Sequence, residues 1–539
     1  MRIYSAPLSK SKRQFQLLAL VMFAAWLGIV LFLTWHHAVW RDEMRALSLA
    51  LQGQNVFTML AGIHGEGHPA VWYLLLRGAH ALVAGPGVLQ LVSISVACAA
   101  VLLFVLRAPF SWPLIALFLG GRVTMFEYSV VARNYGISML LLFLFPAIYE
   151  RYWNRGFMLG LVLFLLANCN APSVLFVGAL LLFWLVDIVT TADGVQRPRA
   201  LRTFLLNAAI AGFGIAICFL TIYPPFNDAA MINRPEGITF KLLFKAIFLP
   251  ATQFRDLMLP GVQNLLMAKL FHGKQPYIVL LQLFLSLIMF GSTLGLIRRI
   301  GAFLAASLTL VGFSLFFVLV YPAGYRHEAL WLVFLISMYW LAASTSIPRE
   351  PALPARPKPL IRPLSKLGSM LFVLLVLLQV SASIREVANA VRNGPPMSRS
   401  RDLGALVAKR SDLQQAIIIA EPDYLVEALP YYISNRAYLI REQRFGNVVH
   451  FTRKGRLQLS LDDVLTSARS LRLQTGKPVL ILLTVRLDPS LPRQVYTEVF
   501  GWEFITTPAE VRTFQASTRL IERFAPASTD ESYDVYIID

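Results

Sequence analysis

Long apolar segments separated by short, charged connections dominate the first 390 residues of this chain. Most of them approach the roughly 20 residues that an α-helix needs to cross the hydrocarbon core of a bilayer. With 57% hydrophobic and only 15% charged residues, the chain has the composition of a polytopic membrane protein. We predict eleven membrane spans, at residues 14–34, 88–106, 112–127, 135–149, 156–169, 172–190, 203–222, 277–297, 301–320, 328–346 and 368–386.

The basic residues predict the orientation of these spans. Lysine and arginine gather in the N-terminal flank and in every second connection, as they do in the cytoplasmic loops of membrane proteins. We therefore expect the N-terminus in the cytoplasm. Because the number of spans is odd, the C-terminal region is expected on the outer side. This topology predicts a multi-pass membrane protein with an extracytoplasmic C-terminal domain.

The net charge of +19 follows the same topology and does not indicate a nucleic-acid partner. From Arg401 to the end the chain has 17 basic and 17 acidic residues, so the excess lies in the first 400 residues. There the basic residues flank membrane spans instead of covering a soluble domain. We expect these charges to face the lipid bilayer surface and no nucleic acid.

The composition changes twice in the last third of the chain. Pro351–Pro363 is rich in proline and arginine, which predicts an extended cytoplasmic linker rather than a helix. From about residue 400, strand-like and helix-like segments alternate as in an α/β domain. We therefore predict a mainly α fold, with a transmembrane helix bundle at residues 1–390 and a soluble extracytoplasmic α/β domain at residues 400–539. The strand-like segments are 415–420, 479–484 and 533–538, and the helix-like segments are 423–433 and 461–473.

Polar residues concentrate in four segments that the predicted topology places on the outer side of the membrane. The first begins with Asp42 and Glu43, close after the first span. Carboxylates near a bilayer are costly, and those that persist usually face a cavity or a site. We therefore expect the four segments to converge on a functional site, with the outer loops 35–87 and 223–276 forming its face. The segments are 40–43, 64–73, 122–136 and 321–328.

The residue types in these segments suit a substrate that carries both a phosphate and a hydroxyl group. Arginine is the preferred planar donor to phosphate oxygens, and a carboxylate can accept the proton of an attacking hydroxyl. Each residue also has a plainer explanation. The carboxylates can begin a solvated loop, and the arginines and tyrosines can be interfacial residues at helix ends. These alternatives concern Asp42, Glu43, Tyr73, Arg133, Tyr135, Tyr325 and Arg326.

The sequence His64-Gly65-Glu66-Gly67-His68 also contains groups that commonly bind metals. The two glycines predict a flexible loop, and no zinc-protease helix pattern surrounds it. A divalent metal at this loop stays open as an alternative, but no cofactor is required by the pattern. A structural or phosphate-binding role for His68 is favoured.

The order of these motifs resembles that of the GT-C glycosyltransferases. The resemblance lies in a first span followed by Asp42-Glu43, in His68-Pro69 leading into an aromatic helix, and in Ala132–Gly136 opening a later span. It is strongest for the branch with the protein O-mannosyltransferases and the bacterial aminoarabinose transferases of lipid A. The resemblance covers roughly residues 14–390, although the matching motifs are short.

This resemblance implies a transferase that moves a sugar, with inversion, from a polyprenyl-phosphate-linked donor to an envelope acceptor outside the cytoplasm. The acceptor would be a lipid, a polysaccharide or a protein. Asp42 would be the general base and Glu43 would support it. Where some relatives have lysine near the lipid phosphate, this chain has His68, so its protonation state matters for the phosphate contact. The resemblance assigns contacts with the donor to Glu66, His68, Arg133, Tyr135 and Arg326, and we expect Tyr73, Tyr325 and His327 to bind substrate beside them.

Two other classes of protein fit parts of the pattern. A transporter or flippase of lipid-linked saccharides would bind phosphate through the same arginines without catalysis. Transporters usually hold their charges near the bilayer midplane, whereas here the charges lie at span ends, which favours the enzyme. A non-catalytic assembly subunit is the third class, and the intact Asp42-Glu43 pair is evidence against it. Within loop 223–276, the apolar stretch Ile238–Leu249 predicts a segment lying in the membrane interface.

Overall fold

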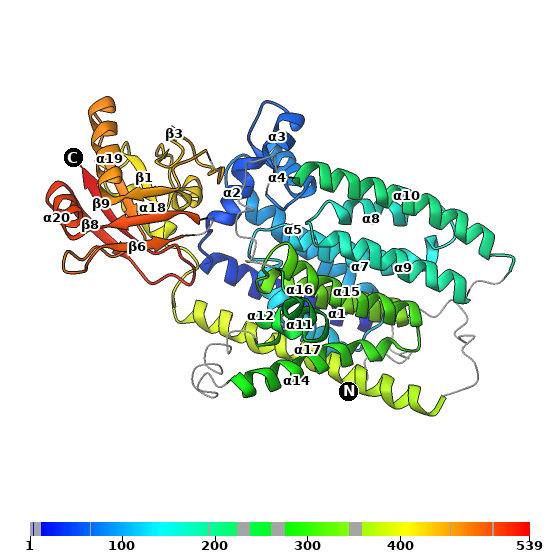
Figure 1. Ribbon diagram of the computed structural model, residues 1–539. Coiled ribbons are helices and arrows are strands. Elements are labelled where there is room, and N and C mark those ends of the chain that lie inside the picture. Colours follow the sequence, from blue (N-terminus) through cyan, green and yellow to red (C-terminus); the bar gives the residue numbers. More distant parts are fainter. Residues whose placement is uncertain are drawn as a thin grey trace.

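The computed structural model describes residues 4, 12–64, 66–191, 194–223, 238–259, 275–343, 358–452, 454–498 and 501–538. It confirms a mainly α fold with a C-terminal α/β domain. Figure 1 shows the helices running side by side, with the α/β domain in yellow to red at one end of the bundle. Among the described residues, every named strand lies after Ala416.

Each of the eleven predicted spans falls on a helical segment, but the helices differ in length and character. Seven described helices are long and apolar enough to cross a membrane, namely α1, α5, α9, α10, α14, α15 and α17. The protein is thus a multi-pass membrane protein. The helices on the predicted spans are α1 (Lys12–His36), α5 (Val88–Arg107), α6 (Trp112–Leu119), α7 (Tyr135–Tyr152), α8 (Met158–Ala167), α9 (Ser173–Thr191), α10 (Arg197–Ile222), α14 (Gln275–Thr293), α15 (Ile300–Leu319), α16 (Tyr325–Ala343) and α17 (Lys358–Val391).

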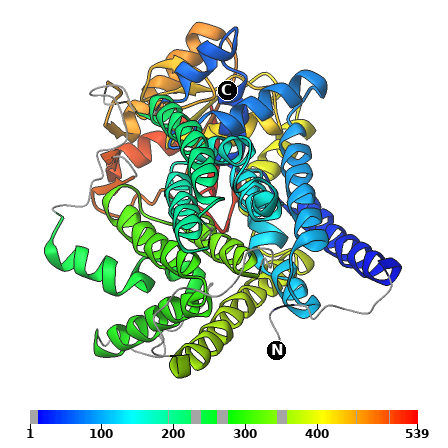
Figure 2. The ribbon, with the colours of Figure 1, turned by 90° about the vertical axis from the view of Figure 1, so that its right-hand side faces the viewer.

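The prediction of eleven full spans was too high by this measure, and the four exceptions have physical causes. The segment 112–127 is broken, because α6 ends at Leu119 and a π-helix, η1 (Val123–Glu127), follows it. Helix α8 has only 10 residues. Helices α7 and α16 have charged residues near one end, and α16 is the core of the bundle, with every residue from Glu328 to Leu341 buried. Figure 2 shows the bundle from the end opposite the α/β domain, with α1 at its edge in dark blue.

The predicted cytoplasmic linker and the first outer loop both contain helices. The predicted linker Pro351–Pro363 is helical from Lys358 onward, with Pro363 inside α17, so that part of the prediction was wrong. Neighbouring helices and local adjustment allow a proline within a long membrane helix. The rest of the linker lies outside the described residues. The outer loop 35–87 contains three helices, α2 (Arg41–Ala50), α3 (Val56–Gly62) and α4 (Ala70–Leu82).

The C-terminal domain is built on a four-stranded sheet with the order β1-β5-β9-β8. Strands β1 and β5 are parallel, and β9 pairs antiparallel with both β5 and β8. The apolar runs of β1 and β5 are fully buried because side chains pack against both faces of the sheet. Its strands are β1 (Ile417–Glu421), β5 (Val479–Leu483), β8 (Arg519–Phe524) and β9 (Tyr533–Ile538), and its helices are α18 (Ser400–Lys409), η5 (Asp423–Tyr431), α19 (Leu461–Thr475) and α20 (Pro508–Ser517).

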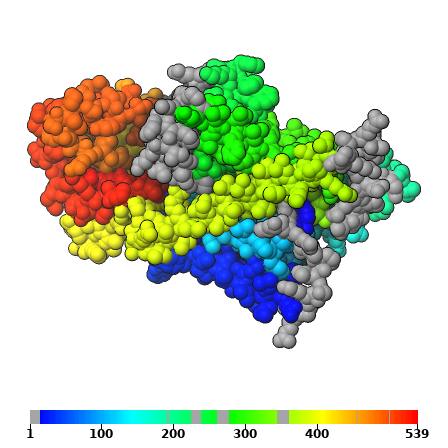
Figure 3. All heavy atoms as spheres, turned by 90° about the horizontal axis from the view of Figure 1, so that it is seen from below, coloured from blue at the N-terminus to red at the C-terminus, as the bar shows by residue number. Residues whose placement is uncertain are grey.

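Two smaller sheets complete this domain. One has three strands in the order β4-β7-β6, and the other is the β2-β3 hairpin. The strands are β2 (Tyr438–Leu439), β3 (Arg444–Phe445), β4 (Gln458–Ser460), β6 (Gln494–Thr497) and β7 (Glu503–Thr506). Figure 3 shows α17, in yellow-green, running along the bundle into the C-terminal domain. The domain also packs against the outer helix α2 through η5.

Candidate active site

Asp42 occupies the second position of α2, the short helix between the first span and the C-terminal domain. The preceding residue, Trp40, is extended, and the carboxylate of Glu43 accepts a hydrogen bond from Trp40 N at 3.2 Å. This contact caps the first turn of the helix, where negative side chains are also favoured by the helix dipole. The Asp42 side chain is 32% exposed, so its carboxylate is accessible to a ligand.

Three arginines from three segments surround the Asp42 carboxylate. Arg326 Nη1 lies 3.4 Å from Asp42 Oδ2, Arg133 Nη1 lies 3.8 Å from the same oxygen, and Arg41 Nε lies 3.9 Å from Oδ1. Arg133 Nη1 also donates to the backbone oxygen of Asp42 at 2.5 Å. Burial by itself raises the pKa of the Asp42 carboxyl, but the three arginines outweigh it and lower the pKa to about 2. Asp42 is therefore an anion at neutral pH.

His68 lies against Arg133 and is neutral. Burial, together with the charge of Arg133, lowers the pKa of His68 well below its usual value. Arg133 Nη2 lies 2.6 Å from His68 Nε2, and because a guanidinium only donates, Nε2 is the acceptor. His68 is thus suited to orienting Arg133 and supplies no positive charge of its own.

Tyr135 and His327 form the next layer of the site. The Tyr135 hydroxyl lies 2.8 Å from His327 Nε2, and Gly324 N donates to His327 Nδ1 at 3.2 Å. With Nδ1 accepting, a neutral His327 donates from Nε2 to the tyrosine oxygen. The Tyr135 ring is also edge-on to His68, with ring centres 6.0 Å apart. These contacts fix the side chains behind the arginines.

Glu43 does not share the accessible space of Asp42. Its side chain has no exposed surface, and Oε2 lies 2.8 Å from His37 Nε2. Oε1 accepts a hydrogen bond from Ala132 N at 2.7 Å. The expected second catalytic carboxylate therefore ties α2 to the segment that begins at Ala132, and any effect on a ligand passes through other residues.

Three of the expected binding residues lie around this group. The Tyr325 hydroxyl donates to Gln379 Oε1 at 2.7 Å, and the Arg122 guanidinium lies 4.5 Å from the centre of its ring. Glu66 accepts a hydrogen bond from Arg45 Nε at 3.1 Å. Tyr73 is fully buried. The structure thus brings Asp42, His68, Arg133, Tyr135, Arg326 and His327 together, and places Tyr325, Glu66 and Tyr73 around them.

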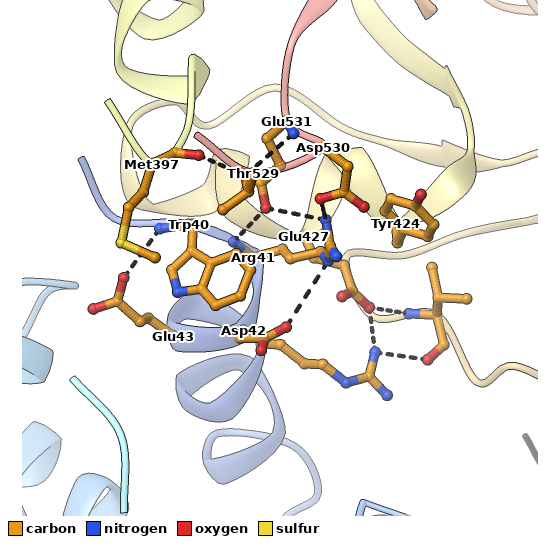
Figure 4. A network of polar contacts seen from close by, with 12 residues as sticks. Trp40, Arg41, Asp42, Glu43, Met397, Tyr424, Glu427, Thr529, Asp530 and Glu531 are labelled. Atoms are coloured by element: carbon orange, nitrogen blue, oxygen red, sulfur yellow. Dashed lines mark hydrogen bonds and ion pairs between the residues drawn. The ribbon is translucent and has the colours of Figure 1, made fainter. Parts of the chain in front are cut away.

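The sequence-based interpretation assigned no role to Arg41 and Arg45, which flank Asp42 on α2. Arg45 pairs with Glu66 and with Glu427 of the C-terminal domain. Both arginines were visible in the sequence at helical spacing, but this segment was interpreted as a loop. Figure 4 shows the resulting network, with Arg41 between Asp42 on one side and Asp530 on the other.

The His64–His68 segment directs its metal-binding side chains to different partners. His64 Nδ1 lies 2.9 Å from Tyr223 O, Glu66 pairs with Arg45, and His68 accepts from Arg133. Within the described ranges, no three histidine, cysteine, aspartate or glutamate side chains are close enough to hold a metal ion. The geometry of this segment therefore does not favour the metal alternative.

Much of the second outer loop, 223–276, lies outside the described residues. Its described part includes α11 (Phe240–Phe248), a 3-10 turn η2 (Pro250–Thr252) and α12 (Arg255–Met258). Phe240, Phe244 and Phe248 of α11 are exposed, which fits the predicted interfacial position. Leu257 N donates to Glu328 Oε2 at 2.7 Å, so α12 is anchored to the beginning of α16. That this loop forms part of the face of the site stays a prediction.

Comparisons with known proteins give distant structural matches only. No protein-family model matches the chain, and no curated protein matches its sequence. The structure of ArnT from Cupriavidus metallidurans in the apo state is 12% identical, with 90% of this chain and 97% of that chain covered and a TM-score of 0.39. Arabinofuranosyltransferase AftD from Mycobacteria is 13% identical, with a TM-score of 0.37; the match covers 100% of this chain and 40% of that one.

The chain is thus distantly similar in overall structure to an ArnT and to an arabinofuranosyltransferase. With TM-scores below 0.5, this likeness carries no argument about activity by itself. Evidence on activity comes from the arrangement of Asp42 and its three neighbouring arginines.

Proposed function

We propose that this protein is a membrane glycosyltransferase that moves a sugar from a polyprenyl-phosphate-linked donor to a hydroxyl group of an envelope acceptor. The reaction would take place on the periplasmic side of a bacterial inner membrane. One observation supports this above all others: the partly exposed carboxylate of Asp42 is surrounded by three arginines where α2 meets the C-terminal domain. Such a set matches an anionic phosphate next to a hydroxyl nucleophile.

The arginines would receive the phosphate of the donor lipid. Arg133 and Arg326 remain partly accessible, with side chains 11% and 18% exposed. Within the described part of the chain, the buried Nε atom of Arg133 and the buried Nε1 atom of Trp40 donate no hydrogen bond. Buried donors usually have partners, so these two atoms support a ligand with acceptor oxygens at this place.

Phosphate binding would also change the basicity of Asp42. In the unliganded site the arginines lower the pKa of Asp42 to about 2, which makes it a weak base. A phosphate between Arg133 and Arg326 would share their positive charge and add negative charge nearby. Both effects raise the pKa of Asp42, so the carboxylate becomes a better proton acceptor once the donor is bound.

In the proposed reaction, Asp42 accepts the proton of the acceptor hydroxyl as its oxygen attacks the anomeric carbon. The bond between that carbon and the phosphate oxygen breaks, and the polyprenyl phosphate leaves with the bonding electrons. Attack opposite the leaving group inverts the configuration. Arg133 and Arg326 stabilise the charge that develops on the phosphate. Glu43, His68, Tyr135 and His327 hold these groups in place.

Asp42→Asn tests this proposal in purified full-length protein in nanodiscs, supplied with a panel of radiolabelled undecaprenyl-phosphate sugars. Release of polyprenyl phosphate and transfer to a membrane-extract acceptor are measured. Wild type should turn over, and Asp42→Asn should lose about 100-fold or more in kcat while still binding the donor. Asp488→Asn, which changes an exposed carboxylate of the C-terminal domain, is the matched control.

The outcomes separate the alternatives. Donor binding by both proteins, without turnover on any donor, would favour a transporter of lipid-linked saccharides. Equal turnover by wild type and Asp42→Asn would leave a transferase but remove Asp42 from the chemical step.

A further inference from the structure

We infer that the C-terminal domain is a working part of the site: its residues Glu531, Asp530 and Glu427 fix the helix that carries Asp42 and draw the Arg41 guanidinium toward the C-terminal domain. This inference rests on the function proposed above for Asp42. It makes the three carboxylates positioning residues, because they act through α2 and Arg41.

Glu531 caps the beginning of α2 from outside the helix. Arg41 is the first residue of α2, so its backbone N–H has no acceptor within the helix. Glu531 Oε1 accepts this hydrogen bond at 2.9 Å, and the Glu531 side chain is only 1% exposed. A buried carboxylate at this end is also favoured by the helix dipole. The position of the first turn, and with it Asp42, therefore depends on a residue near the end of the chain.

The Arg41 guanidinium contacts carboxylates of both domains. Its Nη1 atom lies 2.5 Å from Asp530 Oδ1 and 3.5 Å from Glu531 Oε1, whereas its Nε atom lies 3.9 Å from Asp42 Oδ1. The guanidinium also lies over the Tyr424 ring, 4.4 Å from its centre. The shortest ion pair is with the C-terminal domain, so Asp530 offsets much of the charge that Arg41 would otherwise direct at Asp42.

Arg45 provides a second anchor one helical turn later. It pairs with Glu427, whose side chain is 1% exposed, and donates to Val449 O at 2.8 Å. Glu427 Oε1 also accepts from Val449 N at 2.7 Å. Because Arg41 and Arg45 are four residues apart, they lie on the same face of α2. The C-terminal domain thus contacts this face of α2 (Figure 4). Arg133 and Arg326 of the membrane domain form ion pairs with Asp42.

The segment just before α2 is held by the same domain. The Tyr432 hydroxyl donates to Val39 O at 3.1 Å, and Arg401 donates to His37 O. Donor phosphate would meet arginines of the membrane domain, whereas the placement of Asp42 depends on the C-terminal domain. Loosening the C-terminal contacts should therefore lower turnover without weakening donor binding.

Asp530→Asn and Glu531→Ala test the inference in the full-length protein. We expect kcat to fall about 10-fold, since small displacements of a catalytic group are costly, while KM for the donor changes less than about twofold. Hydrogen exchange of the first turn of α2 should become faster, most clearly in Glu531→Ala. Glu531→Gln, which keeps an oxygen to accept from Arg41 N, should recover most of the loss. Asp412→Asn, an exposed carboxylate of the same domain, should match wild type.

The acidic side of the profile of kcat against pH provides a further test, because a purely structural role of Asp530 would not shift it. In Asp530→Asn the released Arg41 can turn to Asp42 and lower its pKa, so the acid limb should shift to lower pH. Asp530 is 46% exposed, so this variant is expected to fold. Unchanged kcat, acid limb and exchange in both variants would overturn the inference and leave the proposed function standing. If the protein transfers no sugar but the variants show faster hydrogen exchange, the C-terminal carboxylates fix α2 and the proposed function is contradicted.

Discussion

Arg326 Nη1 lies 3.4 Å from Asp42 Oδ2, although the two residues are 284 positions apart in the chain. The Arg326 guanidinium also lies over the Trp40 ring, 4.8 Å from its centre, so it contacts two residues at the beginning of α2. An arginine placed in this way faces the carboxylate in the free protein and is available to a phosphate in the complex. This relationship leads to a prediction on donor binding.

Arg326→Ala should weaken the binding of polyprenyl phosphate about 10-fold or more, because it removes a charged donor to the phosphate. Binding of the lipid to the protein in nanodiscs, measured by displacement of a labelled analogue, checks this. Arg472→Ala, which removes an arginine from the last turn of α19, should bind as wild type does. Equal affinity in wild type and Arg326→Ala would show that Arg326 pairs only with Asp42.

His68→Gln should leave the pH dependence of activity between pH 6 and 8 unchanged. Burial and Arg133 lower the pKa of His68 well below its usual value, so the imidazole does not titrate in this range. Glutamine retains an acceptor for Arg133, whereas His68→Ala does not and should be less active. Profiles of kcat/KM against pH for the three proteins check this. A limb near pH 6.5 that only wild type shows would mean that His68 works in its charged form.

The fold was largely predictable because long apolar segments identify membrane helices in a sequence. All eleven apolar segments fall on helical segments, and the C-terminal strand-like segments fall on β1, β5 and β9. The helix α2 was missed for the opposite reason. Its ten residues include Arg41, Asp42, Glu43 and Arg45, so it has no apolar run, and contacts with distant residues stabilise it. Arg45 is 382 positions from Glu427.

The candidate site was predictable only as a set of segments. Topology placed Asp42, Arg133 and Arg326 on one side of the membrane, and the structure brings their side chains together. The topology alone does not determine in which direction each side chain points from the end of its helix. Tyr325 and Arg326 are adjacent, yet one contacts Gln379 and the other Asp42. Neighbouring residues on a helix point about 100° apart, so helix rotation decides such cases.

Glu43→Ala should destabilise the protein by about 3 kcal/mol, because it leaves buried partners without their carboxylate. The partners are His37 Nε2 and the backbone N–H groups of Trp40 and Ala132. Thermal unfolding followed by tryptophan fluorescence checks this against Glu150→Ala, which changes an exposed glutamate in α7. A melting temperature equal to that of wild type would argue against a positioning role and return Glu43 to the chemistry.

The protein should be more stable at pH 5.5 than at pH 8, because four buried carboxyl groups of the C-terminal domain favour protonation. Burial raises the pKa of Asp423 to about 8, and burial raises the pKa values of Glu421, Glu427 and Glu531 to about 7, despite their neighbouring arginines. In the unfolded chain such groups lose their protons near pH 4. The folded state therefore binds more protons between about pH 4 and 8, and its stability falls as pH rises through this window.

The lowered pKa of Asp42 has the opposite sign, but its effect is confined to pH values below about 4 and does not oppose this trend. Melting temperatures between pH 5.5 and 8 check the prediction, and Glu427→Gln should reduce their slope because it removes one of the titrating groups. Asp462→Asn, at the exposed beginning of α19, should leave the slope unchanged. A melting temperature that rises with pH would mean that the arginines outweigh burial and keep these carboxylates charged. Arg41 and Arg45 would then hold the C-terminal domain through fully ionised pairs across the whole range.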